Sequence, residues 1–141
     1  IDAGDGVMLE VLNPITPPTI GDSFGESALV MRITFGNVSL LLPSDLDADA
    51  QAVLLETGVN PSAQVMVIPR HGASDALDVD FLRAVNPSIA LLQFDPANLS
   101  RDPAPETLDM LAGIPVYRTD QDGTIHVMTD GDLLWQWGEG E

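Results

Sequence analysis

The stretch VMVIPRHGASD, residues 65–75, joins four apolar residues directly to an Arg-His-Gly phrase. A short apolar run that ends at a polar loop is typical of a strand buried on both faces, as the strands of parallel sheets are. In an open α/β sheet, the loops at the carboxyl ends of such strands line the crevice in which ligands bind. His71 is therefore a candidate base or metal ligand at the edge of a sheet.

Around this stretch, strand patterns alternate with helical ones. Strands are expected at 38–43, 64–68 and 89–94, and a helical pattern follows each of them. The first helix has apolar residues at helical spacing, Leu46, Ala50, Val53 and Leu54, and Gly58 as its C-cap. The other two helices are expected over 77–85 and over 104–112, the last beginning around Pro105. Repeated strand-helix order predicts an α/β fold, in which helices cover a mixed β-sheet.

Antiparallel pairing is expected toward both ends of the chain. Strands at 27–35 and 38–43 flank the turn Gly36-Asn37, and another strand is expected at 7–12. The tail is expected to pair antiparallel throughout, with strands at 115–119, 124–129 and 132–137. Leu133, Trp135 and Trp137 share one face of the last strand, and the tryptophans are expected to pack in the core or to cover an edge. Residues 138–141 are expected to be frayed.

The composition limits the possible functions. The chain of 141 residues fits a single domain, and its 22 acidic residues against five arginines and no lysine give a net charge of −17. Direct nucleic-acid binding by this chain is not expected, because phosphate recognition depends on basic groups. The absence of cysteine excludes disulfides, thiolate metal sites and thiol redox chemistry.

Loops at 43–45, 70–75 and 95–103 leave the predicted sheet at comparable places. They bring a set of polar side chains to one edge: Asp45, His71, Asn98 and Asp102. Arg70 adds a positive charge there, and we expect it to pair with Asp45 or Asp102. Two simpler roles stay open, since Asp45 is also placed to cap the following helix and His71 to bond loop backbone. His126, within an alternating strand, is expected to be structural.

The framework phrases resemble a known family. FGESALVMRITFGNVSLLLPSD (24–45), VMVIPRHGASD (65–75), FLRAVNPSIALLQFDPANLSRDP (81–103) and IPVYRTDQDGTIHVMTDG (114–131) occur in the order found in the ComEC family of DNA-uptake competence proteins. The likeness is to the C-terminal half of the metallo-β-lactamase-fold domain of that family. It implies that residues 1–141 form one partial domain of a longer protein, half of an αββα sandwich.

The resemblance also assigns the site residues. The family's Thr-Gly-Asp, His-His-Gly-Ser and Gly-His-Pro phrases correspond to Pro43-Ser44-Asp45, Arg70-His71-Gly72-Ala73 and Arg101-Asp102-Pro103, with Asn98 kept. Asp45 and His71 are then the remaining metal ligands, and Ser44, Arg70, Asn98 and Asp102 belong to a vestigial site. A catalytic zinc needs about three protein ligands, and the family's His-x-His-x-Asp-His motif is absent from this sequence. No cofactor is therefore expected in this chain, and zinc or manganese is expected only in a complete, active domain.

By this resemblance the chain is a soluble domain of a bacterial inner-membrane protein, on the extracytoplasmic side. The parent protein imports transforming DNA, and its upstream half-domain and membrane channel are the expected partners. Whether the domain is an enzyme stays open between a degenerate domain, a metal-dependent phosphodiesterase completed upstream, and a structural or interaction module. Half of such a fold leaves an apolar sheet face, which we expect a homodimer or the loop 13–23 to cover.

Overall fold

The computed structural model describes residues 1–17, 25, 27–95, 97 and 103–140, and every structural statement below refers to them. The strands are β1 (Asp2–Gly4), β2 (Val7–Asn13), β3 (Val30–Phe35), β4 (Val38–Leu42), β5 (Val65–Val67), β6 (Ile89–Leu92), β7 (Val116–Arg118), β8 (Ile125–Thr129) and β9 (Leu134–Gly138). The helices are α1 (Ala48–Glu56), α2 (Val79–Val85), α3 (Pro105–Met110) and α4 (Thr119–Asp122), with a 3-10 turn at Pro69–Gly72.

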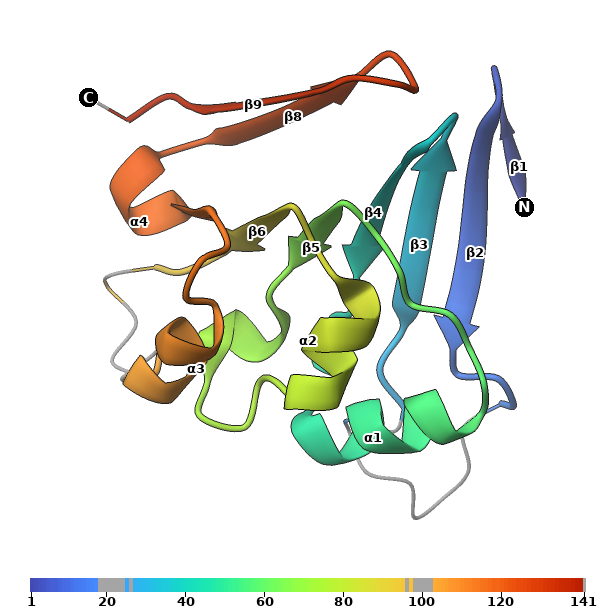
Figure 1. Cartoon of the computed structure of the whole chain (residues 1–141), viewed down its shortest axis with the longest axis horizontal. Coiled ribbons are helices and arrows are strands. Elements are labelled where there is room, and N and C mark those ends of the chain that lie inside the picture. The colour runs from blue at the N-terminus through green and yellow to red at the C-terminus, as the bar shows by residue number, and fades with distance from the viewer. Residues whose placement is uncertain (18–24, 26, 96, 98–102, 141) are drawn as a thin grey trace.

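Seven strands within the described residues form one mixed sheet in the order β1 to β7. The pairs from β1 to β4 are antiparallel, and those from β4 to β7 are parallel. The helices α1, α2 and α3 connect the parallel strands and lie together on one side of the sheet (Figure 1). This confirms the predicted α/β class, and the mixed sheet is compatible with an α/β sandwich.

Local signals in the sequence fix the element boundaries. Gly36 has a φ of 57° in the turn that joins β3 to β4, as expected for Gly36-Asn37. Helix α1 begins where the Asp47 carboxylate accepts a hydrogen bond from the Ala50 amide at 2.9 Å. Helix α2 begins in the same way at Asp78, whose carboxylate accepts from the amides of residues 80 and 81. Short polar residues at these positions satisfy amides that a helix leaves unpaired.

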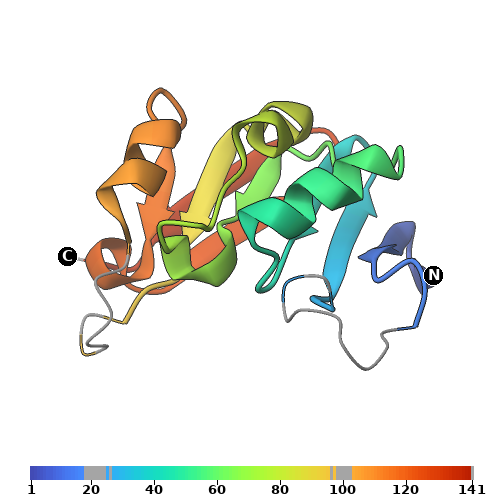
Figure 2. The same ribbon diagram turned by 90° about the horizontal axis from the view of Figure 1, so that it is seen from below.

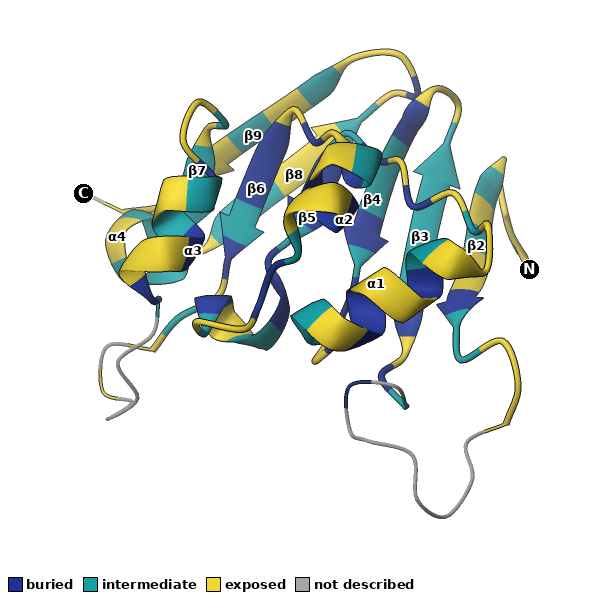
Figure 3. Cartoon of the chain, turned by 60° about the horizontal axis from the view of Figure 1, so that its bottom comes forward, coloured by how far each residue is buried: buried dark blue, intermediate teal, exposed yellow. Residues whose placement is uncertain are grey.

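The main core lies between the helices and the sheet. Leu41, Met66 and Ala90 are neighbours in register across β4, β5 and β6, and each is 0% exposed. Phe81 of α2 and Leu54 of α1 pack into the same cluster. Burying each large apolar side chain contributes about 1.5–3 kcal/mol, so this layer is the main source of stability. Figure 3 shows the resulting contrast between the buried strand β6 and the exposed outer surfaces of the helices.

Gln51 is a fully buried polar side chain in this layer. Its Nε2 donates to the backbone carbonyls of Leu46 at 2.9 Å and Ala76 at 2.6 Å. Its Oε1 accepts from the Asp78 amide at 2.8 Å. One side chain thereby ties the loop that follows β4 to the loop that follows β5.

The β8–β9 hairpin lies on the opposite face of the sheet from the helices (Figure 2). Val127 and Leu134 face Ile33, Leu40 and Val65 across a small apolar cavity of about 150 Å³. This hairpin covers the beginnings of β4 and β5, so part of the apolar face expected to need a homodimer or the loop 13–23 is covered internally. Residues 18–23 of that loop lie outside the described residues.

The tip of the hairpin is attached to the turn between β3 and β4. The Asn37 amide donates to the Gly131 carbonyl at 2.6 Å, and Asn37 Nδ2 donates to Asp132 Oδ1 at 2.7 Å. A Cβ on Gly36 would lie 2.5 Å from the Gly131 carbonyl oxygen, so the close approach of the two turns requires glycine at position 36.

The tail differs from its expected antiparallel pairing. Strand β7 pairs parallel with β6, and the connection between the expected strands 115–119 and 124–129 is largely the short helix α4. Thr119 explains the change, because its Oγ1 accepts from the Phe94 amide at 2.8 Å and donates to the Phe94 carbonyl at 2.9 Å. These bonds hold the end of β7 beside the end of β6, and only β8 and β9 then pair antiparallel.

Two further expectations about the tail are corrected. Trp135 and Trp137 are 41% and 44% exposed, so they are not core residues. They lie on the outer face of the hairpin, because Val127 and Leu134 occupy the inner one. The expected frayed tail is paired as far as residue 140, since the amides of Glu139 and Gly140 donate to Thr124 and Asp122 at 2.9 and 2.7 Å. No helix in the described part of the chain is long and apolar enough to cross a membrane.

Candidate functional site

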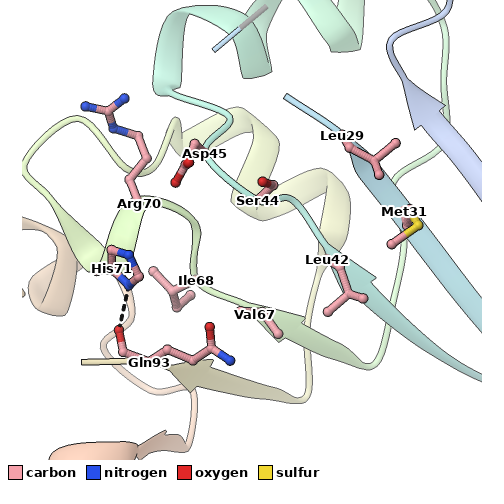
Figure 4. A pocket seen from close by; sticks show the side chains of 10 residues that line it. All are labelled: Leu29, Met31, Leu42, Ser44, Asp45, Val67, Ile68, Arg70, His71 and Gln93. Carbon is pink, nitrogen blue, oxygen red and sulfur yellow. Dashed lines mark hydrogen bonds between the residues drawn. The ribbon is translucent and has the colours of Figure 1, made fainter. Parts of the chain in front are cut away.

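An open groove runs along the carboxyl ends of β4, β5, β6 and β7. It lies on the same face of the sheet as the hairpin, in the part that the hairpin does not cover. The hollow beside Asp45 and His71 has a volume of about 410 Å³. The floor is apolar and consists of Leu29, Met31, Leu42, Val67 and Ile68. Polar residues line one side of it: Ser44, Asp45, Arg70, His71 and Gln93 (Figure 4). The strand-end loops thus bring Ser44, Asp45, Arg70 and His71 together, while Asn98 and Asp102 lie outside the described residues.

The backbone around the groove is strained. Five non-glycine residues in the described ranges have a left-handed φ, and three of them line this groove: Ser44 (52°), Arg70 (49°) and His71 (53°). Each such residue costs about 1–2 kcal/mol and persists only where its surroundings hold it. Here the Arg70 amide donates to the Ser44 carbonyl at 3.3 Å, and the Ala104 amide donates to the Gly72 carbonyl at 2.8 Å. Strain of this kind clusters at binding and catalytic sites.

Gly72 extends the left-handed run with a φ of 78°. A Cβ at this position would lie 3.0 Å from the Pro103 Cβ and 3.1 Å from the Leu92 Cδ1. The chain therefore needs glycine here both for its conformation and for the close approach to the segment around Pro103. This accounts for the His-Gly sequence at the end of β5.

The imidazole of His71 is oriented by the neighbouring strand. Its Nδ1 lies 3.0 Å from the Gln93 carbonyl oxygen. Because a carbonyl only accepts, Nδ1 carries the hydrogen and the lone pair of the neutral ring is on Nε2. Figure 4 shows the Gln93 bond on one side of the ring and Asp45 on the other. His71 therefore fills the expected backbone-bonding role and still presents a nitrogen suited to ligation or proton transfer.

The capping role considered for Asp45 belongs to Asp47. The Asp47 carboxylate bonds the first turn of α1, whereas Asp45 is exposed and lines the groove. The Asp45 carboxylate has no hydrogen-bond partner within the residues that the structure describes. Asp45 is therefore available to a ligand rather than committed to the helix.

Arg70 does not pair with Asp45. Its Nε instead lies 3.1 Å from Asp75 Oδ1. The left-handed backbone at Arg70 turns the side chain away from His71, as Figure 4 shows, and toward the next loop. Its other expected partner, Asp102, lies outside the described residues. The positive charge of Arg70 is thus partly compensated at the rim and is not aimed at the space between Asp45 and His71.

Gln93 and Thr119 complete the groove and were missed as site residues. Two more hollows adjoin the first, of about 360 and 510 Å³, and Gln93 and Thr119 line both of them. Thr119 is fixed by its bonds to Phe94 and by the adjacent ion pair, in which Arg118 Nη2 lies 2.7 Å from Asp120 Oδ2. The hydrogen bond from Arg118 lowers the pKa of Asp120 below its usual value. Gln93 and Thr119 both lie at the ends of predicted strands, which is the same signal that made His71 a candidate.

The donors at this edge fall short of a complete metal site. Asp45 and His71 supply one carboxylate oxygen donor and one imidazole nitrogen, and Ser44 adds only a neutral hydroxyl. Within the described ranges no group of three or more His, Cys, Asp or Glu side chains is placed to hold a metal ion. Zinc sites in proteins use three or four such ligands. The described donor set alone therefore does not fit a catalytic zinc.

Comparison with known proteins gives one informative similarity. No protein-family model matches the chain. The chain is 28% identical over 121 residues to ComE operon protein 3 of Bacillus subtilis (strain 168). The aligned region covers 84% of this chain and 15% of that protein. The likeness thus extends over most of this fold but over a small part of the relative.

Proposed function

We propose that this chain is part of a ComEC-type competence protein, where it forms the C-terminal part of a metallo-β-lactamase-fold domain and takes part in DNA uptake. The observation that carries the proposal is the 28% identity with ComE operon protein 3 over 84% of the chain. Asp45 and His71 at adjacent strand ends add support, because the family resemblance assigns the site to these loops. In this arrangement the domain lies on the extracytoplasmic side and contacts an upstream half-domain and a membrane channel.

We further propose that the chain does not hydrolyse DNA by itself. The described residues offer two metal ligands, Asp45 and His71, whereas a catalytic metal needs about three. Arg70 occupies the position at which the family has a second histidine. The net charge of −17 also opposes direct binding of a phosphate backbone. Its contribution to uptake is then structural or regulatory.

A second candidate is a metal-dependent phosphodiesterase completed by further ligands from an upstream His-x-His-x-Asp-His segment. The observation that favours it is the orientation of His71, whose Nδ1 bond to Gln93 leaves Nε2 on the side of Asp45. Zinc or manganese would be the metal in that case. A purely structural or interaction module is the third candidate, and it needs neither Asp45 nor His71.

A DNA-uptake assay on the full-length protein separates a domain with a degenerate site from a phosphodiesterase. Deleting this domain should lower uptake of labelled DNA at unchanged levels of the remaining protein, and unaltered uptake would refute the role in competence. The double variant Asp45→Ala/His71→Ala should keep uptake within about twofold of the unchanged protein if the site is degenerate. Loss of uptake in this variant, but not in the exposed α1 control Asp49→Ala, would refute the degenerate site and favour the phosphodiesterase instead.

Metal analysis provides an independent measurement. We expect zinc or manganese titrated into this chain to bind with no stoichiometric, saturable heat. Tight binding of one metal ion per chain that is lost in His71→Ala would overturn the proposal of a degenerate site. The matched control is His126→Ala, which removes the other histidine of the chain on the far side of the hairpin.

A further inference from the structure

The outer surface of the β8–β9 hairpin has no role in the groove. Met128 pairs with Trp135 across the two strands, and His126 pairs with Trp137. The rings of His126 and Trp137 stack with centroids 4.9 Å apart and planes 9° from parallel. We call the outward surface of these four residues the hairpin face. Met128, Trp135 and Trp137 are between 41% and 53% exposed, so this is an aromatic and aliphatic surface in contact with solvent.

The hairpin face is supported from below and at its tip. Its underside packs on the sheet through Val127 and Leu134, and its tip is tied to Asn37 by two hydrogen bonds. The His126 ring is held between Trp137 and the Glu139 carboxylate, whose Oε1 lies 2.7 Å from Nε2. Because the hairpin backbone and the His126–Trp137 pair are already held in place, ordering them costs little conformational entropy when a partner binds.

The surroundings of the hairpin face are acidic. Residues 119–140 contain no lysine or arginine and five carboxylates: Asp120, which is paired with Arg118, and Asp122, Asp130, Asp132 and Glu139. At the tip, Asp130 accepts from the amides of residues 132 and 133, and these bonds lower its pKa below the usual value. Because neutral groups donate these bonds, the charge is not neutralised. Carboxylates lie at both ends of the hairpin: Asp130 and Asp132 are at the tip, and Glu139 is at the other end.

This charge pattern selects among the possible occupants. Single-stranded DNA and anionic lipid would be repelled by the carboxylates, although tryptophan can stack on bases and enter membrane interfaces. A second copy of the chain would bring two equally acidic surfaces together. A cationic side chain, in contrast, is attracted both by the carboxylates and by the face of an exposed indole.

We propose that the hairpin face binds an extended basic segment of a partner protein, in which lysine or arginine residues flank aliphatic ones. A cationic side chain lies over the Trp137 indole beside the Glu139 carboxylate. Aliphatic side chains of the segment contact Met128 and Trp135. A second cationic side chain lies toward the tip carboxylates at Asp130 and Asp132.

Intrinsic fluorescence tests the proposal directly, because the only two tryptophans of the chain are both on the hairpin face. The probe is a ten-residue peptide of alternating lysine and valine, titrated at low salt. We expect a saturable shift of tryptophan emission to shorter wavelength. The dissociation constant should rise about tenfold between low and high salt as surface charges are screened. Peptides with glutamate in place of lysine, or serine in place of valine, should bind at least several-fold more weakly.

Matched variants separate a local site from general attraction to an acidic protein. Glu139→Gln should weaken binding of the lysine-valine peptide about threefold, whereas Asp109→Asn, an exposed residue of α3 that removes the same charge, should leave it unchanged. Trp135→Ala should weaken binding further, with Trp137 still reporting. Equal effects of Glu139→Gln and Asp109→Asn would overturn the proposal. A larger emission shift with an oligothymidylate or with phosphatidylcholine vesicles than with the lysine-valine peptide would also overturn it. Self-association measured by sedimentation, with a larger emission shift than the peptide gives, would do the same.

Discussion

Replacing Gln51 by leucine removes a buried side-chain link between the two loops that carry Asp45 and His71. The Gln51 amide makes three hydrogen bonds to backbone groups, and the side chain is 0% exposed. Leucine has a similar volume, so the cost arises from the hydrogen bonds rather than from a cavity. At about 1 kcal/mol net for each bond, the free energy of unfolding should fall by about 3 kcal/mol.

Urea unfolding followed by far-ultraviolet circular dichroism measures this loss, and thermal unfolding should show a fall of about 10 °C in Tm. Tryptophan fluorescence is a poor probe of this transition, because both indoles lie on the hairpin. Gln121→Leu is the control: Gln121 is an exposed residue of α4, and its replacement should change stability by less than about 0.5 kcal/mol. A loss below about 1 kcal/mol for Gln51→Leu, with an unchanged m-value, would refute the reasoning about this buried amide.

Substitutions test three further contacts. Asp47→Ala should cost about 1 kcal/mol because it removes the α1 cap, whereas Asp45→Ala should stay within about 0.5 kcal/mol in the same urea titration. Gly36→Ala should destabilise more than Gly58→Ala, measured by thermal unfolding, because both have positive φ but only Gly36 meets a facing carbonyl; equal losses would argue against that contact. Arg118 lowers the folded-state pKa of Asp120 below the unfolded value. The stabilisation that this ion pair gives the fold is therefore present above the unfolded pKa and is lost as pH falls below about 4. Asp120→Asn should therefore flatten the acid side of the stability-pH curve, and an unchanged slope would contradict this ion pair.

Much of the sheet and helix order follows from short-range signals. The apolar runs at β5 and β6 predict buried parallel strands because both faces of each run are apolar, and Val65, Met66, Ile89 and Ala90 are indeed buried. The Gly36-Asn37 turn predicts the β3–β4 pair. The rule that strand ends converge predicts the neighbourhood of Asp45 and His71, and it would have found Gln93 and Thr119 if applied to every strand.

Contacts between segments far apart in the sequence could not be predicted from the same short-range signals. The pattern at 115–119 suits an edge strand in either direction, and its parallel pairing depends on the Thr119 bonds to Phe94. The alternation in the hairpin places Trp135 and Trp137 on one face without deciding which face turns inward, since Val127 and Leu134 make the other face equally apolar. The partner of Arg70 depended on a left-handed φ, which residue type alone does not indicate.

The agreement between strand order and chain order has a consequence for how the protein is made. Because β1 to β7 lie side by side in the order of synthesis, each strand that leaves the ribosome finds its neighbour already in place. Each closure then spans a short stretch of chain, which keeps its entropic cost low and favours rapid assembly. The contact between Asn37 and Asp132 spans 95 residues, so we expect the hairpin to dock on the sheet after the sheet has formed.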